Sequence, residues 1–434
     1  MKKINIIQNP YLLYFPFFVM YIIYIFVFPT DGSYGDEQRY LMYAGNLLKG
    51  YYSPPYPNIE ITNGPGYPII LMPFLGLKLP LICFALLNAL FYYLSVVFLF
   101  KALQQVVSHW TAVYISLFWA LYFNSFHYMP IILAETFTVF LISLLIFSLL
   151  KAFNSNDSIK TRNYIFLSGI TIGYIVLTKI IFTYVLLFMI VGTVILWFSN
   201  RKSGNYRKGM LILLISFSIN IPYFVYTYNL TGKVLYCGST GGDNLYWMST
   251  PFEKEYGDWH NFNAKSDSKN SLILNHQKDR AMIAHVNQVP DDDIIKRIAI
   301  QNIKSYPLKY LQNWTCNIGR MLFGFPYSYE LQRPGPLLGL PQSGLICLLL
   351  LFSLIPTLIN WFKIIYPIRF VIFFTLLYLG GSSLASAESR MFTSIVPILL
   401  VWIAYILQNT IRINLKFEKK SEFIGNNKLI EEIK

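Results

Sequence analysis

Residues 160–208 read KTRNYIFLSGITIGYIVLTKIIFTYVLLFMIVGTVILWFSNRKSGNYRK. The apolar part, 163–199, would be roughly 55 Å long as one helix, whereas the hydrocarbon core of a membrane is about 30 Å thick. Basic clusters flank it on both sides, beginning at Lys160 and at Arg201. Because clustered lysines and arginines stay on the cytoplasmic side, the chain must cross twice and reverse near Lys179. The stretch therefore predicts two membrane helices, 163–178 and 180–198.

The composition extends this reading to the whole chain. Of 434 residues, 55% are apolar and only 13% are charged, whereas soluble domains carry about a quarter charged residues. This excludes a soluble multidomain enzyme and a disordered chain. We expect an all-α polytopic membrane protein with about ten spanning helices and both termini cytoplasmic. The expected spans are 11–29, 81–100, 110–128, 131–150, 163–178, 180–198, 209–228, 343–362, 366–384 and 392–410.

The net charge of +14 follows from this threading. Most of the basic excess falls in the predicted cytoplasmic loops and in the tail after residue 411, as the positive-inside rule requires. A nucleic-acid partner is therefore not needed to explain the charge.

The threading divides the chain into four parts. Residues 1–228 form an N-terminal transmembrane module that contains a first outer loop, 30–80. Residues 229–342 form a large extracytoplasmic loop, residues 343–411 the C-terminal transmembrane helices, and residues 412–434 a basic cytoplasmic tail. Within the large loop, the acids 291–293 open an amphipathic helix, and 313–325 is too short to span and reads as an interfacial or re-entrant helix.

The spacing of the cysteines and histidines predicts neither a disulfide framework nor a metal site. Cys237 and Cys316 share the large loop, where they are either a disulfide or two free thiols. The three histidines of this loop lack the spacing of metal ligands, so we interpret them as surface residues; they are His260, His276 and His285.

Ionisable residues next to the predicted spans gather on the outer face. Charged groups at a membrane segment are costly and are by default functional. Their shared face, reached from separate segments, predicts one outward-facing site. The residues are Asp36, Glu37, Glu135, Lys179, Glu388 and Arg390.

The first outer loop carries the most informative motif. Tyr40, Tyr43 and Leu47 follow helical spacing, and Gly50 fits a helix stop, so we predict a helix lying on the membrane surface. Asp36 at its start either faces a substrate or simply caps the helix. Glu135, at the start of a span, either contacts the acceptor or snorkels to the interface.

Four motifs in this order resemble the GT-C glycosyltransferases, in particular the protein O-mannosyltransferase and aminoarabinose transferase families. They are Asp36-Glu-x-Arg-Tyr with a later Gly-Tyr, Gly64-Pro-Gly-Tyr-Pro, Leu133-Ala-Glu-Thr-Phe and Ala387-Glu-Ser-Arg-Met-Phe. The resemblance implies a GT-C type helix bundle. It also implies transfer of a sugar, with inversion, from a polyprenyl-phosphate donor to a hydroxyl or phosphate of a lipid, protein or glycan acceptor. This transfer would take place on the extracytoplasmic face of the cell's inner or plasma membrane.

The resemblance also implies roles for individual residues. Asp36 would remove the acceptor proton, and Glu37 and Glu135 would contact the acceptor or a metal. Four cations would meet the donor phosphate, and four further residues would shape the site. The cations are Lys179, Arg390, Arg39 and Arg320; the shaping residues are Tyr40, Gly66, Tyr67 and Glu388.

One departure and two alternatives stay open. Some relatives have a Glu-Lys pair where this chain has Asn63-Gly64, so a divalent metal is possible but not required. A lipid-linked sugar flippase would place charges at the membrane midplane, often in repeated halves, which the sequence lacks. A glycan polymerase or ligase would lack the Asp36 motif.

Overall fold

The computed structural model describes residues 9–55, 58–199, 204–260, 274–282, 289–330 and 334–409. Within these ranges the regular structure is helical, apart from one isolated bridge residue, Glu60. This confirms the expected all-α fold. The helices are α1 (Pro10–Val27), α2 (Gly35–Leu48), α3 (Gly66–Gly76), α4 (Leu81–Leu103), α5 (His109–Ala120), α6 (Phe123–His127), α7 (Ala134–Asn154), α8 (Ser158–Thr178), α9 (Ile181–Ser199), α10 (Gly204–Thr231), α11 (Gly241–Met248), α13 (Gln277–Arg280), α14 (Val289–Ser305), α15 (Pro307–Phe323), α16 (Pro334–Ile359), α17 (Tyr366–Ser383) and α18 (Ser389–Asn409), with a 3₁₀ turn, η2 (Trp361–Lys363).

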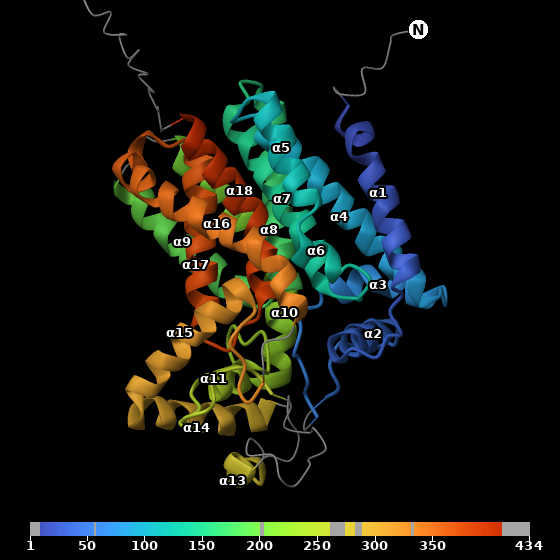
Figure 1. Cartoon of the computed structure of the whole chain (residues 1–434), viewed down its shortest axis with the longest axis vertical. Coiled ribbons are helices and arrows are strands. Elements are labelled where there is room, and N and C mark those ends of the chain that lie inside the picture. Colours follow the sequence, from blue (N-terminus) through green and yellow to red (C-terminus); the bar gives the residue numbers. More distant parts are fainter. Residues whose placement is uncertain are drawn as a thin grey trace, which may run out of the picture.

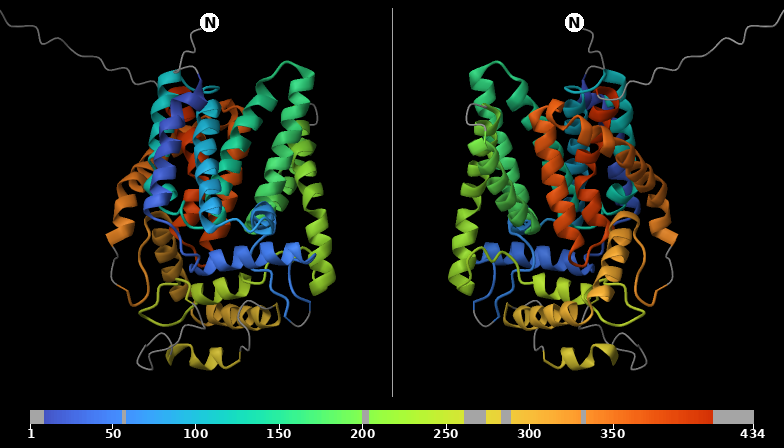
Figure 2. Two further views of the ribbon diagram at one scale, coloured as in Figure 1. Left: turned by 90° about the vertical axis from the view of Figure 1, so that its right-hand side faces the viewer. Right: turned by 90° about the vertical axis from the view of Figure 1, so that its left-hand side faces the viewer.

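The long helices form one bundle with two distinct ends (Figure 1). At the first end, here called the loop end, α2, α11 and α14 lie across the bundle axis (Figure 2). At the other end, here called the tail end, α1 begins and α18 finishes. There the Lys101 Nζ donates to the Tyr11 hydroxyl at 2.7 Å, and the Ser108 N–H donates to the Gln408 side chain at 3.0 Å.

Among the residues that the structure describes, seven helices are long and apolar enough to cross a membrane by length and composition. The chain is therefore an integral membrane protein, but the expected count of ten spans is not confirmed. The expected span 110–128 is interrupted after Ala120, where α6 begins as a separate short helix. Helices α8 and α17 are not among the seven; both carry charged residues, such as Arg162 and Arg369. The sides that the two ends face stay a prediction.

Small residues let α8 and α10 pack closely. A methyl group added at Gly169 or Gly173 would lie 2.7 Å or 3.0 Å from an isoleucine side chain of α10. The Ser216 hydroxyl and the Asn220 amide of α10 donate to the carbonyls of these glycines at 2.9 Å and 3.1 Å. Small faces joined by polar donors are typical of helix pairs in membranes, where no hydrophobic force drives association. This contact fixes α8 and with it the residue that follows it, Lys179.

The large loop folds against the loop end. Helix α14 matches the amphipathic helix expected to begin at the acids 291–293. Its Ile295 is buried against α11. The interfacial helix expected at 313–325 is longer and starts earlier, as α15. The Asp292 carboxylate accepts from the Gly242 N–H at 2.7 Å, so it caps α11. Cys237 and Cys316 are both free thiols.

Arg320 on α15 joins the segments of the loop end. Its guanidinium is fully buried and donates to the backbone carbonyls of four residues at 2.9–3.2 Å and to the Asn317 side chain at 2.6 Å. The four carbonyls belong to Tyr256, Gly257, Pro326 and Ala387. All five N–H donors of an arginine are thereby used, so Arg320 has none left for the donor phosphate that the sequence assigned to it. It positions the segment leading into α18 instead.

Replacing this guanidinium should destabilise the protein strongly. Arg320→Met leaves buried carbonyls without donors, and each such group costs about 1–3 kcal/mol. We expect a loss of several kcal/mol of unfolding free energy, measured as a lower melting temperature in detergent. Arg297→Met, which removes an exposed arginine from α14, is the control and should melt like the wild type. Equal melting of the two variants would contradict this role of Arg320.

Candidate functional site

Six charged side chains from four helices meet at the loop end. Asp36 and Arg39 lie in the first turns of α2, Glu135 in the first turn of α7, and Lys179 directly after α8. Glu388 and Arg390 flank the start of α18. We call these six residues the charged cluster. With three acids and three bases, its formal charges balance, and the predicted meeting of distant segments occurs here.

Asp36 lies between two arginines. One carboxylate oxygen pairs with Arg39 and the other with Arg390, and the residue is 8% exposed. Burial alone raises the pKa of this carboxyl, but Arg390 and Arg39 outweigh burial and lower the pKa to about 2. Helix capping does not explain Asp36, because Tyr34 is the N-cap residue and both Asp36 oxygens face arginines.

Glu135 and Lys179 form a second pair beside Asp36. The Lys179 Nζ lies 3.1 Å from one Glu135 oxygen and 3.0 Å from the Ser394 hydroxyl. The same Glu135 oxygen lies 3.8 Å from Arg390, whereas its other oxygen is buried without a hydrogen-bond partner. The Arg39 Nε is likewise buried without an acceptor. The charged cluster thus contains one buried acceptor and one buried donor without a hydrogen-bond partner.

Arg390 connects all three acids. It pairs with Asp36, lies within 4 Å of Glu135, and its Nε is 3.0 Å from Glu388. Among the three acids, Glu388 has the most exposed side chain, at 35% of its surface. Arg390 therefore holds the first-loop acid and the α7 acid in one arrangement.

The backbone of the first loop determines where Lys179 lies. A methyl group at Gly64 would be 2.0 Å from the Leu177 carbonyl oxygen, and one at Gly66 would be 2.5 Å from the Thr178 hydroxyl. Only residues without a side chain let this loop approach the end of α8 so closely. Gly64 and Gly66 thereby fix the direction in which the chain leaves α8.

Glu37 faces the protein rather than the charged cluster. Its carboxylate accepts from the Thr30 hydroxyl at 2.7 Å, the Ile132 N–H at 2.8 Å and the Tyr34 N–H at 3.3 Å. These bonds connect the start of α2 to the loop before α7. The structure therefore gives Glu37 a positioning role, and nothing in it favours the contact with acceptor or metal that the sequence suggested.

Two tyrosines that the sequence analysis assigned to the site, Tyr40 and Tyr67, pack against each other. The rings of Tyr40 and Tyr67 lie edge to face, 5.1 Å apart. The Asn63 side chain donates to the Tyr40 hydroxyl at 3.2 Å, and the Tyr67 hydroxyl donates to Asn88 at 2.8 Å. Both tyrosines are buried, which agrees with a shaping role.

The described residues contain no group of three His, Cys, Asp or Glu able to hold a metal ion. In the charged cluster the acids face cationic side chains rather than one another. His260 lies 2.9 Å from Asp258, and His276 lies 2.8 Å from Glu255, so each histidine belongs to a local pair within the large loop. His276 is buried, so its interpretation as a surface residue is wrong. His285 lies outside the described residues.

Sequence reasoning missed two contributors. Gly64 enters the sequence analysis as part of a family motif and as a departure from a Glu-Lys pair, but without a structural role. A glycine beside Pro65 and Gly66 is nevertheless a signal for close backbone approach. Ser394, which accepts from Lys179, carries no signal in the sequence because serines are common in spanning helices. Its role depends on which face of α18 turns toward α8.

Comparison with known proteins bears on this site. Residues 49–233, less than half of the chain, match the family model of dolichyl-phosphate-mannose-protein mannosyltransferases. This match confirms the resemblance to membrane glycosyltransferases of the GT-C superfamily, and the matched family is one of glycosyltransferases. No curated protein matches the chain.

Solved structures give weaker likenesses. An oligosaccharyltransferase from Archaeoglobus fulgidus, tethered to an acceptor peptide, is 12% identical with a TM-score of 0.46, over 91% of this chain and 49% of that one. ArnT from Cupriavidus metallidurans, bound to undecaprenyl phosphate, is 10% identical with a TM-score of 0.42, over 91% of this chain and 76% of that one. This chain thus spans about half the length of the archaeal enzyme. Likenesses at this level identify neither substrate nor reaction.

The close approach at Gly64 can be tested by adding one methyl group. Gly64→Ala should lower the melting temperature, because its Cβ would collide with a backbone carbonyl, and overpacking costs about 1–3 kcal/mol. The matched control is Gly45→Ala in α2, whose Cβ would meet only a leucine side chain at 3.6 Å. The control should melt at or above the wild-type temperature. A Gly64→Ala protein as stable as the control would contradict the close approach.

The ion pairs of Asp36 should give a defined pH dependence. Because the folded-state pKa of about 2 lies below the ordinary value of 3.8, the pairs stabilise fully above the ordinary value and lose their effect as the pH falls toward about 2. The melting temperature of the wild type should therefore exceed that of Asp36→Asn by a constant amount between about pH 5 and 7. The difference should shrink below about pH 4.

A control and a contrary result make this test decisive. Glu253→Gln removes an exposed acid of the large loop and should leave the melting temperature unchanged. If the difference in melting temperature between the wild type and Asp36→Asn already changes between about pH 5 and 7, Asp36 is not held by the two arginines.

Proposed function

We propose that this protein is a membrane glycosyltransferase that moves a sugar from a polyprenyl-phosphate donor to an acceptor at the charged cluster. The observation that carries the proposal is the arrangement of Asp36 between Arg39 and Arg390, with Lys179 beside them. A sugar transfer of this kind needs a carboxylate for the acceptor proton and cations for a leaving phosphate. The charged cluster supplies both within one set of contacts.

In the proposed reaction Asp36 takes the proton of an acceptor hydroxyl. The acceptor oxygen forms a bond to the anomeric carbon, and the bond between that carbon and the phosphate oxygen breaks. The polyprenyl phosphate leaves with the electron pair, and the configuration at the anomeric carbon inverts. Glu135 has a free, buried oxygen, which suits it to orient the acceptor.

The cations have the complementary task. Arg39 has a free buried N–H, and Lys179 and Arg390 lie beside it in the charged cluster. A donor phosphate that attracts these groups competes with Asp36 for them. As the arginines turn toward the phosphate, the carboxylate loses the partners that depress its pKa and becomes a stronger base. Donor binding would thus prepare the proton acceptor.

Metal chemistry is not needed for this scheme. The two oxygens of Asp36 and one of Glu135 already face cationic side chains, which can stabilise a leaving phosphate as a metal would. We therefore route no step through a metal. The orientation we propose has the charged cluster on the extracytoplasmic face and both termini in the cytoplasm, following the charge distribution.

The proposal is tested by donor turnover. Purified wild type and Asp36→Asn are incubated with a panel of polyprenyl-phosphate hexoses and pentoses, and release of free polyprenyl phosphate is followed. We expect turnover by the wild type and a loss of about 10²–10⁴-fold in Asp36→Asn, the usual contribution of a general base. Binding of the donor should persist in the variant, because all three cations remain.

Asp31→Asn is the matched control. Asp31 is an exposed acid of the same loop whose carboxylate accepts from the Ser33 N–H and is hydrogen-bonded to the Ser33 side chain. Because Asp31 lies outside the charged cluster, this variant should turn over like the wild type. Equal turnover by Asp36→Asn would remove Asp36 from the chemistry and direct attention to Glu135. Movement of the donor across reconstituted bilayers without turnover would favour a transporter.

A further inference from the structure

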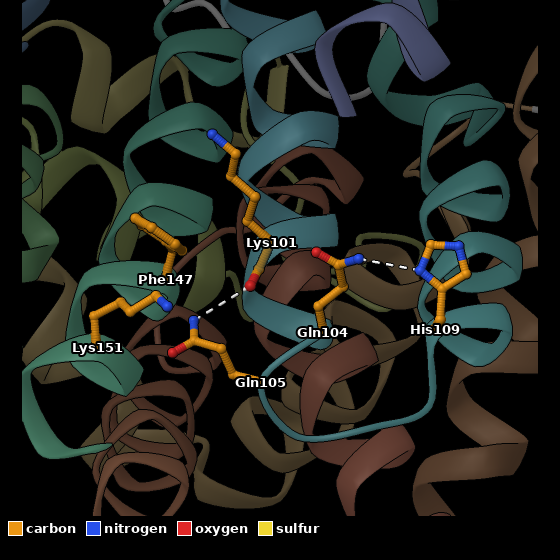
Figure 3. A pocket seen from close by; sticks show the side chains of 6 residues that line it. All are labelled: Lys101, Gln104, Gln105, His109, Phe147 and Lys151. Carbon is orange, nitrogen blue, oxygen red and sulfur yellow. Dashed lines mark hydrogen bonds between the residues drawn. The ribbon is translucent and has the colours of Figure 1, made fainter. Parts of the chain in front are cut away.

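A second polar site lies at the tail end of the bundle, opposite the charged cluster. A cavity of about 530 Å³ opens there between the ends of α4 and α7 and the start of α5. Figure 3 shows the six side chains that line it. They are Lys101, Gln104, Gln105, His109, Phe147 and Lys151. This volume is within the usual range for small-ligand sites, about 300–1,000 Å³.

The polar lining of this cavity comes from two lysines, two glutamines and a histidine, and it contains no acid. No carboxylate among the described residues pairs with Lys101 or Lys151. The Lys101 ammonium is held instead by the Tyr11 hydroxyl at 2.7 Å and lies 4.1 Å from the centre of the Tyr11 ring. Lys151 lies in the last turn of α7, and its ammonium has no side-chain partner among the described residues. Two uncompensated positive charges therefore border one cavity.

His109 adds a directed donor. The Gln104 amide nitrogen lies 3.1 Å from the His109 Nδ1, and an amide nitrogen can only donate. The Nδ1 of the neutral ring therefore accepts, and Nε2 carries the proton. Figure 3 shows Nδ1 turned toward Gln104 and the other ring nitrogen turned away from it. His109 is also the first residue of α5, where the helix dipole favours an anion.

The position of the cavity indicates the source of its ligand. Lys101 and Lys151 stand in the last turns of two helices that are apolar enough to cross a membrane. Lysines at this position lie at the depth of lipid headgroups. Phe147 lies one turn deeper on α7 and gives the cavity an apolar wall. Basic pockets between spanning helices are sites where phosphate-bearing lipid headgroups bind.

We propose that this cavity binds the phosphate of an anionic membrane lipid, with Lys101, Lys151 and His109 as its contacts. Such a ligand would join the ends of α4, α5 and α7. Since it binds the folded state alone, it would raise the melting temperature in proportion to its occupancy. This site is independent of the reaction proposed for the charged cluster.

The test measures melting of delipidated full-length protein in a non-ionic detergent. Phosphatidylglycerol, phosphatidylcholine or inorganic phosphate is added in separate titrations. We expect phosphatidylglycerol to raise the melting temperature more than phosphatidylcholine does. In Lys101→Gln/Lys151→Gln the half-saturating amount of phosphatidylglycerol should rise about tenfold or more, because each lysine near a headgroup contributes to binding.

Two control variants separate the site from general surface charge. Lys101→Arg/Lys151→Arg keeps the charges and should keep the response. Lys160→Gln/Arg162→Gln removes two charges from the start of α8, outside the cavity, and should also keep it. If the double glutamine variant does not fold, Lys151→Gln alone serves, since the Lys151 ammonium has no partner among the described residues.

Each outcome decides the proposal. A phosphatidylglycerol response that depends on Lys101 and Lys151 supports a lipid site. The same dependence with inorganic phosphate at equal concentration supports the phosphate site but identifies a soluble ligand. A response that is equal in the wild type and the lysine variants, or that is lost equally in the α8 control, overturns the proposal.

Discussion

A carboxylate buried at the edge of a membrane needs a counter-charge, because water is not there to solvate it. Asp36 meets this constraint with two arginines that come from opposite ends of the sequence, Arg39 and Arg390. Other residues of the loop end keep these charged side chains in place. Arg320 and Asn317 bind the segment before Arg390, Glu37 holds the start of α2, and glycines bring Lys179 alongside.

The sequence predicted this arrangement in part. The class of fold and the meeting of Asp36, Glu135, Lys179, Glu388 and Arg390 follow from apolar runs and from the cost of charge near a membrane, which are local signals. The direction of a side chain is not a local signal. Glu37 and Arg320 have the right type and location for a site, yet the hydrogen bonds of both go to other parts of the protein, mostly to backbone groups. Only the packing of segments distant in sequence determines this.

The same limit applies to the count of spans. Apolarity alone counted 110–128 as one helix, but the structure interrupts it between α5 and α6. No glycine or proline between Ala120 and Phe123 signals that break. Polar bonds across the bundle accompany it instead, since Gln342 of α16 donates to the Leu121 carbonyl at 2.9 Å and accepts from the Phe123 N–H at 2.7 Å. A side chain more than 200 residues away thus satisfies the backbone at the break.

Under the proposed reaction, the pairing of Asp36 with two arginines links proton uptake to donor binding. A donor phosphate would compete with the carboxylate for the positive charge of both arginines. A phosphate that weakens these pairs raises the proton affinity of Asp36, and protonation of Asp36 frees the arginines and strengthens phosphate binding by the same factor. In the absence of donor the carboxylate is a poor base, because its pKa is about 2. The protein would thereby avoid activating an acceptor hydroxyl before the sugar that it should attack has arrived.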